Sequence, residues 1–160
     1  MKKRLSSEQL LPLLKDITEN NGIFPLTVTG TSMTPTLYSE RDIVNLVSPK
    51  NRIPKKYDIV LFVRNDGKVI LHRIIKILPD NRFLINGDSQ TWTEIICQTQ
   101  IVAVAQSFIR NQKHISCNSF TMKLYSRVWC LFRPLRPLFF RLSSFLKKTL
   151  HNKSHQGQDP

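Results

Sequence analysis

A serine lies in a short break between two β-like runs, in the stretch VTGTSMTPTLYSERDIV at residues 28–44. Gly30 permits close approach of another backbone or a strained dihedral before Ser32, and Pro35 restricts the chain after it. A hydroxyl mounted on such a turn can act as a nucleophile, and the backbone N–H of the turn can donate to an oxyanion. Serines in loops are more often turn or capping residues, so the hydroxyl by itself leaves both roles open.

A serine nucleophile needs a base, and His72 is the histidine whose position suits that role. The other three histidines lie in the basic last third of the chain, whereas His72 lies inside the β-like run KVILHRIIKI. Strand alternation puts His72 on the same face as Ile70 and Ile74. Arg73 then points to the opposite face. A lone histidine on an apolar face is often a core residue, and catalysis requires the fold to bring it within about 3 Å of Ser32.

The apolar patterns predict the elements that would position these two residues. Residues 6–20 predict a short amphipathic helix that contains Pro12. From Phe24 onward the chain has six short runs rich in Val, Ile and Phe, bounded by Asn, Asp, Gly and Pro. The Asn-Asp-Gly turn at 65–67 predicts a hairpin, and LPDNR at 78–82 predicts a second. Six strands without intervening helices predict a mainly β fold, as a coiled antiparallel sheet or barrel.

The charge of the chain is concentrated in its last third. The sequence has 24 basic and 11 acidic residues, a net charge of +13, and no acidic residue between Glu94 and Asp159. Residues 120–150 mix large apolar and basic side chains, a composition that suits a helix lying on a membrane surface. A helix packed on the β domain with a basic outer face is the alternative. Aromatic side chains among the arginines favour lipid, so nucleic acid is not the expected partner.

The cysteines and the hydropathy favour a reducing compartment. Three widely spaced cysteines without a C-x-x-C pair predict neither a disulfide framework nor a zinc site. The apolar run after the basic start is too short and too interrupted for a secretory signal. No segment reaches the roughly 20 apolar residues of a spanning helix. We expect a cytoplasmic protein, or one peripheral at a membrane, with no cofactor and no metal.

Five short motifs occur in order between about Gly30 and Val104: GTSMTPTL, RDIV, KKYDIVLF, LHRII and INGDS. In this order they resemble the motif set of the signal peptidase and LexA-like peptidase superfamily, the S24/S26 serine peptidases. The resemblance implies a mostly β fold in which the Ser of S-M-x-P attacks a peptide carbonyl, which is the place of Ser32. His72 occupies a position that carries Lys in bacterial signal peptidases and LexA-like proteins, and His in the endoplasmic-reticulum and archaeal type.

A histidine at this position has a physical advantage over a lysine. A lysine with an unperturbed pKa of about 10.4 must lose roughly three units before it is a neutral base near pH 7, whereas an imidazole starts near about 6.5. His72 can therefore serve as a base without deep burial. It would take the proton of Ser32 and later return it to the leaving amine.

The resemblance also implies candidates for the remaining roles in the site. NGDS is similar to the Gly-Asp motif of the family, so Asp88 is a candidate to orient or support the site, with a plain turn as the alternative. Glu94 lies six residues further on, where the endoplasmic-reticulum type has the acid of its triad. A glutamate there must retract to make the same contact, and a solvated surface charge is the alternative. Met33 is expected to line the substrate channel, or else to be core, and Gly30 to shape the turn near the oxyanion.

The expected organisation has four parts: an amphipathic helix at 1–22, an S24/S26-like peptidase β domain at 23–110, a basic and apolar segment at 111–150, and a disordered tail at 151–160. The expected function is a serine endopeptidase that cleaves a signal, leader or precursor peptide bound as an extended strand. The alternatives are a family member without turnover and a non-catalytic β module whose basic tail binds membrane or nucleic acid. Unlike most relatives, the chain has neither a spanning helix nor room for a DNA-binding domain before S-M-x-P.

Overall fold

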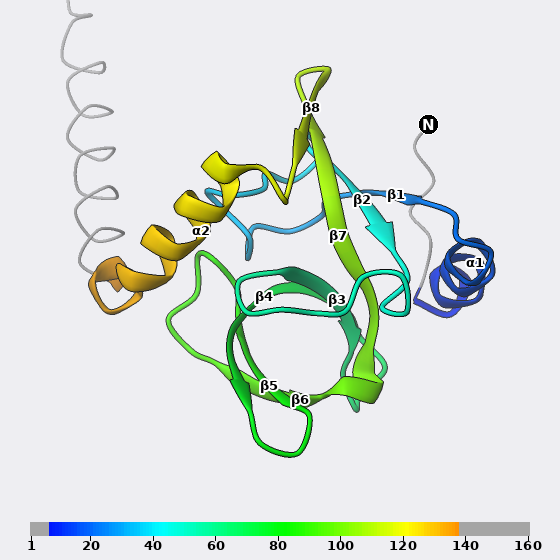
Figure 1. Ribbon diagram of the computed structural model, residues 1–160, viewed down its shortest axis with the longest axis horizontal. Helices are drawn as coiled ribbons and strands as arrows, with labels where there is room; N and C mark the ends of the chain where they lie inside the picture. The colour runs from blue at the N-terminus through cyan, green and yellow to red at the C-terminus, as the bar shows by residue number, and fades with distance from the viewer. Residues whose placement is uncertain (1–6, 138–160) are drawn as a thin grey trace, which may run out of the picture.

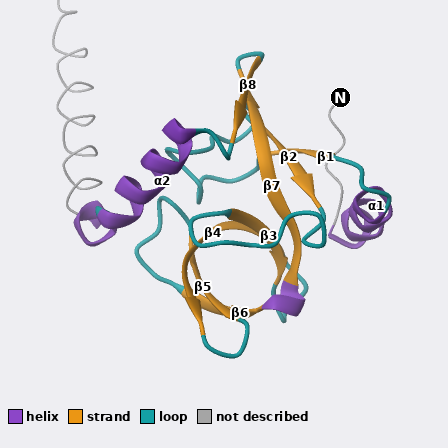
Figure 2. Ribbon diagram, viewed as in Figure 1, coloured by secondary structure: helices purple, strands orange, loops and turns teal. Residues whose placement is uncertain are grey.

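A computed structural model describes residues 7–137 of the chain (Figures 1 and 2). It contains two α-helices, two short 3-10 helices and eight strands within that range. In chain order these are α1 (Ser7–Glu19), β1 (Phe24–Thr27), β2 (Ile43–Val47), β3 (Ile59–Val63), β4 (Val69–Leu78), β5 (Arg82–Asn86), β6 (Glu94–Cys97), η1 (Gln98–Gln100), β7 (Ile101–Arg110), β8 (Lys113–Ser116), α2 (Phe120–Leu131) and η2 (Arg133–Leu135).

All eight strands belong to one antiparallel sheet with the order β1-β2-β7-β3-β4-β5-β6, and β8 pairs with β7 outside this path. Figure 1 shows the sheet curling on itself, with β3, β4, β5 and β6 around a rounded cross-section and β7 crossing beside them. In this view α1 and α2 lie on opposite sides of the sheet. The mainly β fold with a short N-terminal helix and a C-terminal helix is therefore confirmed.

The two hairpins expected from turn residues are present. Gly67 has φ +79°, and β3 and β4 pair from Val63 with Val69 onward. Asp80 and Asn81 have φ +59° and +54°, which are the left-handed values that a two-residue hairpin turn requires at both central positions. Asn and Asp tolerate these angles better than other side chains do.

The sheet buries both of its faces in the middle. The first four residues of β3, within the run IVLFV, are all buried, and alternate side chains contribute to two different cores. Ile59 and Leu61 join a cluster under α1 and β2, whereas Val60 and Phe62 join the cluster inside the curled part of the sheet. A continuous apolar run is typical of a strand buried on both faces.

The helix expected at residues 6–20 is confirmed as α1, with Pro12 inside it. Leu10 and Leu14 are buried in the same cluster as Phe24, so the helix closes one end of that core. No helix among residues 7–137 has the length and apolar character needed to cross a bilayer. The expected membrane-surface segment at 120–150 is described only as far as residue 137, and the expected tail at 151–160 lies outside the described residues.

Two strands were not expected from the sequence. β6 begins at Glu94 and contains only four residues, of which Ile96 alone is buried. β8 is equally short, and the turn before it is Asn111-Gln112, with φ of +47° and +64°. Glutamine is not a typical hairpin residue, so this turn gives little sequence signal. Both strands form because a neighbour in the sheet offers free backbone groups, which is information that short sequence patterns do not carry.

Candidate active site

Ser32 lies in the turn between β1 and β2, with a glycine shortly before it and buried residues after it. Gly30 has φ +77°, a value in the left-handed region that favours glycine. Met33 and Leu37 are buried in the core and are joined by a backbone hydrogen bond of 2.9 Å from the Leu37 N–H to the Met33 carbonyl. The turn is therefore anchored immediately after Ser32, which is itself only partly buried. The burial of Met33 agrees with the core alternative for that residue.

The turn that follows β5 holds the backbone of Ser32. The Ser89 N–H donates to the Ser32 carbonyl at 2.9 Å, and the Ser89 hydroxyl donates to the Thr31 carbonyl at 2.9 Å. A Cβ on Gly87 would lie 2.8 Å from the same Ser32 carbonyl oxygen, closer than real Cβ contacts allow. Glycine at position 87 therefore permits the two turns to touch. Neither Gly87 nor Ser89 was singled out from the sequence, although a glycine directly after a strand is a signal of close backbone approach.

His72 lies on β4, next to the strand position where β5 ends and the Gly87–Ser89 turn begins. Its neighbour Arg73 is in register with Asn86, the last residue of β5, so Gly87 continues the chain past His72. The same turn contacts Ser32, and these contacts bring the serine and the histidine to one end of the sheet. Within residues 7–137 no hydrogen bond joins the Ser32 hydroxyl to the imidazole.

The imidazole of His72 is 1% exposed and packs between two aromatic rings. The ring centres of Phe62 and Trp92 each lie 6.0 Å from its own. Burial lowers the pKa of His72 below its ordinary value of 6.5; the negative charge of Glu94 opposes this shift, and the positive charge of Arg64 adds to it. The histidine is therefore neutral at pH 7, which is the form that can accept a proton.

Glu94 is the carboxylate beside this histidine. Its Oε1 lies 3.4 Å from His72 Nδ1, which is within ion-pair range, but Nδ1 makes no hydrogen bond among the described residues. Arg64 holds both carboxylate oxygens, with Nε to Oε2 at 2.7 Å and Nη2 to Oε1 at 2.6 Å. Arg64 thus positions Glu94, and the Oε1 atom that it holds is also the oxygen near the His72 ring.

Asp88 faces a different partner from Glu94. Its carboxylate accepts two hydrogen bonds from Arg73, Nε to Oδ1 at 2.9 Å and Nη2 to Oδ2 at 2.6 Å, and one from the Thr36 hydroxyl. Both charged side chains are essentially inaccessible to solvent. Asp88 is also the residue between Gly87 and Ser89. The buried ion pair therefore holds the turn that contacts Ser32, and it does so from the face of β4 opposite to His72.

Helix α2 is packed against this polar cluster. The Tyr125 hydroxyl lies 3.0 Å from that of Thr36, and Arg73 Nη1 donates to the Ser126 hydroxyl at 2.8 Å. One turn later, the Trp129 indole donates to the Asp88 carbonyl at 3.2 Å. The described part of the C-terminal segment thus packs on the β domain. This packing was the alternative to a helix lying on a membrane surface.

Arg136, just beyond α2, contacts the same turn. It is 2% exposed, and its Nη1 donates to the Asn86 side-chain carbonyl at 2.8 Å, while its guanidinium lies 4.9 Å from the ring centre of Trp129. This arginine was not identified from the sequence, where it is one of many in a basic region. Its burial is the feature that distinguishes it, and burial of an arginine is rare without such partners.

The comparisons with known proteins give one match. A family model described as Peptidase S24-like matches residues 2–107, which is more than half of the chain and includes Ser32, His72, Asp88 and Glu94. No curated protein and no solved structure gives a significant match. No group of three or more His, Cys, Asp and Glu side chains among residues 7–137 is arranged to hold a metal ion. With its motifs in order, its curled antiparallel sheet and this match, the chain belongs to the Peptidase S24-like family.

Proposed function

We propose that the protein is a serine endopeptidase in which Ser32 is the nucleophile and His72 the general base. The observation that carries this proposal is the contact between two turns: the Gly87–Ser89 turn bonds the backbone of Ser32 and runs past the strand position of His72. The neutral, buried state of the imidazole supports the same assignment. Membership of the Peptidase S24-like family is consistent with peptidase chemistry.

The proposed reaction follows the acyl-transfer scheme of serine hydrolases. The Ser32 hydroxyl oxygen attacks the carbonyl carbon of the scissile bond while His72 accepts the hydroxyl proton. When the tetrahedral intermediate collapses, the C–N bond breaks and the imidazolium returns the proton to the leaving amine. Water then hydrolyses the acyl-enzyme, and His72 accepts a proton from that water. As the acyl C–O bond to Ser32 breaks, His72 returns this proton to the serine oxygen, and both products leave.

Glu94 is the proposed third member of the site. An oxygen 3.4 Å from Nδ1 favours the tautomer with its proton on that nitrogen, and it stabilises the imidazolium that forms during the reaction. Nε2 is then the nitrogen that accepts the proton of Ser32. Asp88 has a different role in this proposal, because its carboxylate is saturated by Arg73 and Thr36. It positions the turn that holds Ser32.

The proposed substrate is a signal, leader or precursor peptide. An extended peptide would add its backbone to the sheet and present alternate side chains to pockets. The resemblance to signal peptidases favours small side chains before the cleaved bond.

The test is covalent labelling by a fluorophosphonate probe, with the modified residue identified by mass spectrometry. We expect labelling at Ser32 in the wild-type protein, no labelling of Ser32→Ala, and a strong reduction in His72→Gln. Ser39→Ala is the matched control, since it removes another partly buried serine hydroxyl from the same β1–β2 connection, and it should be labelled like the wild type. Equal labelling of the wild type and Ser32→Ala would disprove the proposed nucleophile.

We also propose a peripheral membrane association through α2, because one face of this helix is apolar and exposed. Phe120, Leu124, Val128 and Leu131 are between 42% and 79% exposed and follow helical spacing. The partner is a bilayer surface with anionic phospholipids, to which the adjacent basic side chains are complementary in charge. We expect flotation of the protein with vesicles that contain phosphatidylglycerol, and its loss in Leu124→Ser/Leu131→Ser. Flotation equal to that of the wild type would exclude this face as the contact.

A further inference from the structure

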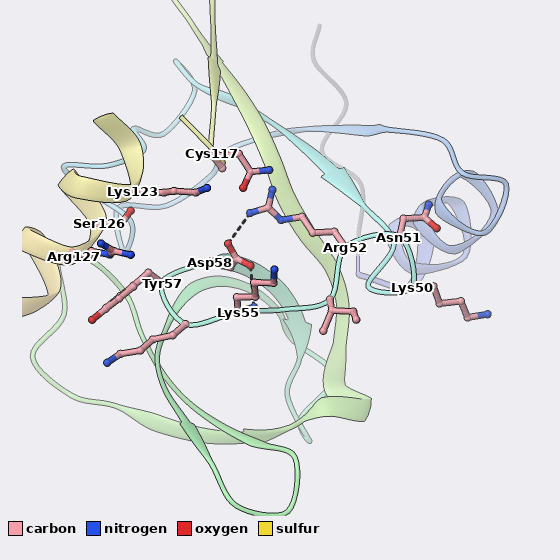
Figure 3. Close-up of a pocket in the computed structure, with 13 residues that line it drawn as sticks. Lys50, Asn51, Arg52, Lys55, Tyr57, Asp58, Cys117, Lys123, Ser126 and Arg127 are labelled. Atoms are coloured by element: carbon pink, nitrogen blue, oxygen red, sulfur yellow. Dashed lines mark hydrogen bonds and ion pairs between the residues drawn. The ribbon is translucent and has the colours of Figure 1, made fainter. Parts of the chain in front are cut away.

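A cavity of about 560 Å³ lies between the segment that connects β2 with β3 and the first turns of α2 (Figure 3). Ser32 and His72 do not line it, so it is distinct from the candidate active site. Its lining residues are Lys50, Asn51, Arg52, Ile53, Lys55, Lys56, Tyr57, Asp58, Cys117, Asn118, Lys123, Ser126 and Arg127. Six of these side chains are basic and one is a carboxylate. The cavity therefore has a strong positive charge.

The single carboxylate does not neutralise the cavity. Asp58 accepts a hydrogen bond of 2.7 Å from Arg52 Nη2 and one of 2.9 Å from the backbone N–H of Lys55. Cys117 also lines the cavity, and burial raises the pKa of its thiol to about 11, so the thiol is protonated at neutral pH. No other carboxylate lines the cavity.

Arg52 has a donor with no acceptor in the described part of the protein. Its side chain is 15% exposed, and its Nη1 is buried without a hydrogen-bond partner. A buried donor left unsatisfied costs about 1 to 3 kcal/mol, and more when it is charged, so such groups are rare in proteins. In Figure 3 the guanidinium of Arg52 and the ammonium group of Lys123 point toward one another across the cavity. The guanidinium nitrogen nearer to Lys123 is the one that donates to Asp58. An anion placed there would meet two cationic groups.

The backbone at the edge of the cavity is strained. Tyr57 has φ +78°, a left-handed value that is a clear outlier for an aromatic residue. Its N–H donates to the Ile74 carbonyl at 2.7 Å, and its own carbonyl accepts from Arg73 Nη1 at 3.0 Å. These bonds to β4 hold the strained conformation. Strain of this kind is concentrated at ligand-binding and catalytic sites.

We propose that this cavity is a binding site for a phosphate group, either free or as part of a lipid headgroup. A phosphate offers several acceptor oxygens around a compact negative charge, which matches the positive charges of the Arg52 guanidinium and the Lys123 ammonium group that line the cavity. Arg127 adds a third cation one helical turn beyond Lys123, on the same side of α2. The lysine and the arginines come from two elements, so binding links the β2–β3 connection to the helix.

The test measures the binding of inorganic phosphate by titration calorimetry and of vesicles by flotation. Lys123→Gln/Arg127→Gln removes two exposed cations of the cavity, and Lys76→Gln/Lys113→Gln removes two exposed cations outside it as the charge-matched control. We expect the first variant to weaken phosphate binding at least tenfold and the control to match the wild type. Ser32→Ala should bind phosphate as the wild type does, because the site does not depend on the peptidase proposal.

The vesicle measurement separates the two sources of the phosphate group. A loss of flotation with phosphatidylglycerol vesicles in the Lys123/Arg127 variant but not in the control, with no flotation on phosphatidylcholine alone, supports a lipid headgroup. Cavity-dependent binding of inorganic phosphate without cavity-dependent flotation supports a soluble phosphate compound. Absence of both, or an equal loss in the control variant, overturns the proposal. Cavity-dependent capture of an acidic peptide without any binding of phosphate also overturns it.

Discussion

Arg73 on β4 and Asp88 in the turn after β5 form a buried ion pair. Two hydrogen bonds of 2.9 and 2.6 Å join them, and their side chains are 1% and 0% exposed. Burial alone would disfavour the charge of Arg73, but the carboxylate of Asp88 raises the pKa of the guanidinium above its ordinary value. The same arginine bonds Tyr57 and Ser126. One charged pair thus connects the turn after β5, the β2–β3 connection and α2.

Asp88→Asn should destabilise the protein strongly. The change leaves Arg73 charged, buried and without its counter-ion, and removal of one partner of a buried pair costs about 3 to 5 kcal/mol. The measurement is the free energy of unfolding in urea. Asp66→Asn is the control, because Asp66 pairs with Lys68 at an exposed site and should change stability only slightly. Similar values for the two variants would contradict the structural role of the buried pair.

Gly87→Ala should slow the reaction of Ser32 with a fluorophosphonate at least tenfold. The added Cβ would lie 2.8 Å from the Ser32 carbonyl oxygen and 2.6 Å from the Gln90 side-chain oxygen, and misplacement of a reacting group by about 1 Å can cost about a hundredfold in rate. Gln90→Ala alone should react like the wild type. If the double variant Gly87→Ala/Gln90→Ala regained full reactivity, the contact with Ser32 would not be the cause.

The reactivity of Ser32 should decrease as the pH falls, with its midpoint below pH 6.5. Burial lowers the pKa of His72 from 6.5, so the imidazole remains a neutral base to a more acidic pH than a solvated histidine would. The measurement is the rate of fluorophosphonate labelling as a function of pH. A midpoint above pH 7, or a rate that does not change between pH 8 and 4, would rule out His72 as the base.

The same shift should make stability depend on pH. Below about pH 6.5 the unfolded chain binds a proton at His72 that the folded protein does not bind, so stability is lost as the pH falls toward the lower pKa of the folded state. His72→Gln has no titrating group at this position. Between pH 7 and 5 the wild type should lose more unfolding free energy in urea than this variant does, and equal losses would show that His72 is not the group responsible.

Arg136→Ala should destabilise the protein by about 1.5 to 3 kcal/mol, the usual contribution of hydrogen bonds to a charged group. The change removes the donor to the Asn86 side chain and the cation next to Trp129. Arg133→Ala is the control, because no side-chain hydrogen bond of Arg133 is found within residues 7–137 and the residue is partly exposed. A loss of stability no larger than that of the control would mean that Arg136 does not hold the turn after β5.

Several local features could be predicted because they depend on a few adjacent residues. The hairpin at Asn65-Asp66-Gly67 follows from turn residues that accept left-handed φ values, and the face of His72 follows from strand alternation. Ile74 lies in the inner core, Ile70 packs against it, and Phe62 contacts His72, whereas Arg73 on the opposite face reaches Asp88 and α2. The backbone alone imposes this division of faces.

The partners of the charged residues could not be predicted in the same way. Asp88 and Glu94 are both acids near the end of β5, and the motif left their roles open. The structure separates them: Asp88 bonds Arg73 in the interior, whereas Glu94 bonds Arg64 and approaches His72. Arg136 and the lining of the phosphate cavity were hidden for a similar reason, because their neighbours are distant in the chain and their burial depends on how α2 packs.

The sequence by itself determined the strands, their turns and the family, since backbone conformation and short motifs act over a few residues. Only the tertiary structure decided that the turn after β5 bonds the Ser32 carbonyl and that Glu94 is the acid beside the imidazole of His72. It also decided where six cations surround a cavity. The physical reason is that hydrogen bonds and charge interactions depend on distances in space. In this protein those distances are set by a sheet that curls and by a helix that packs back onto it.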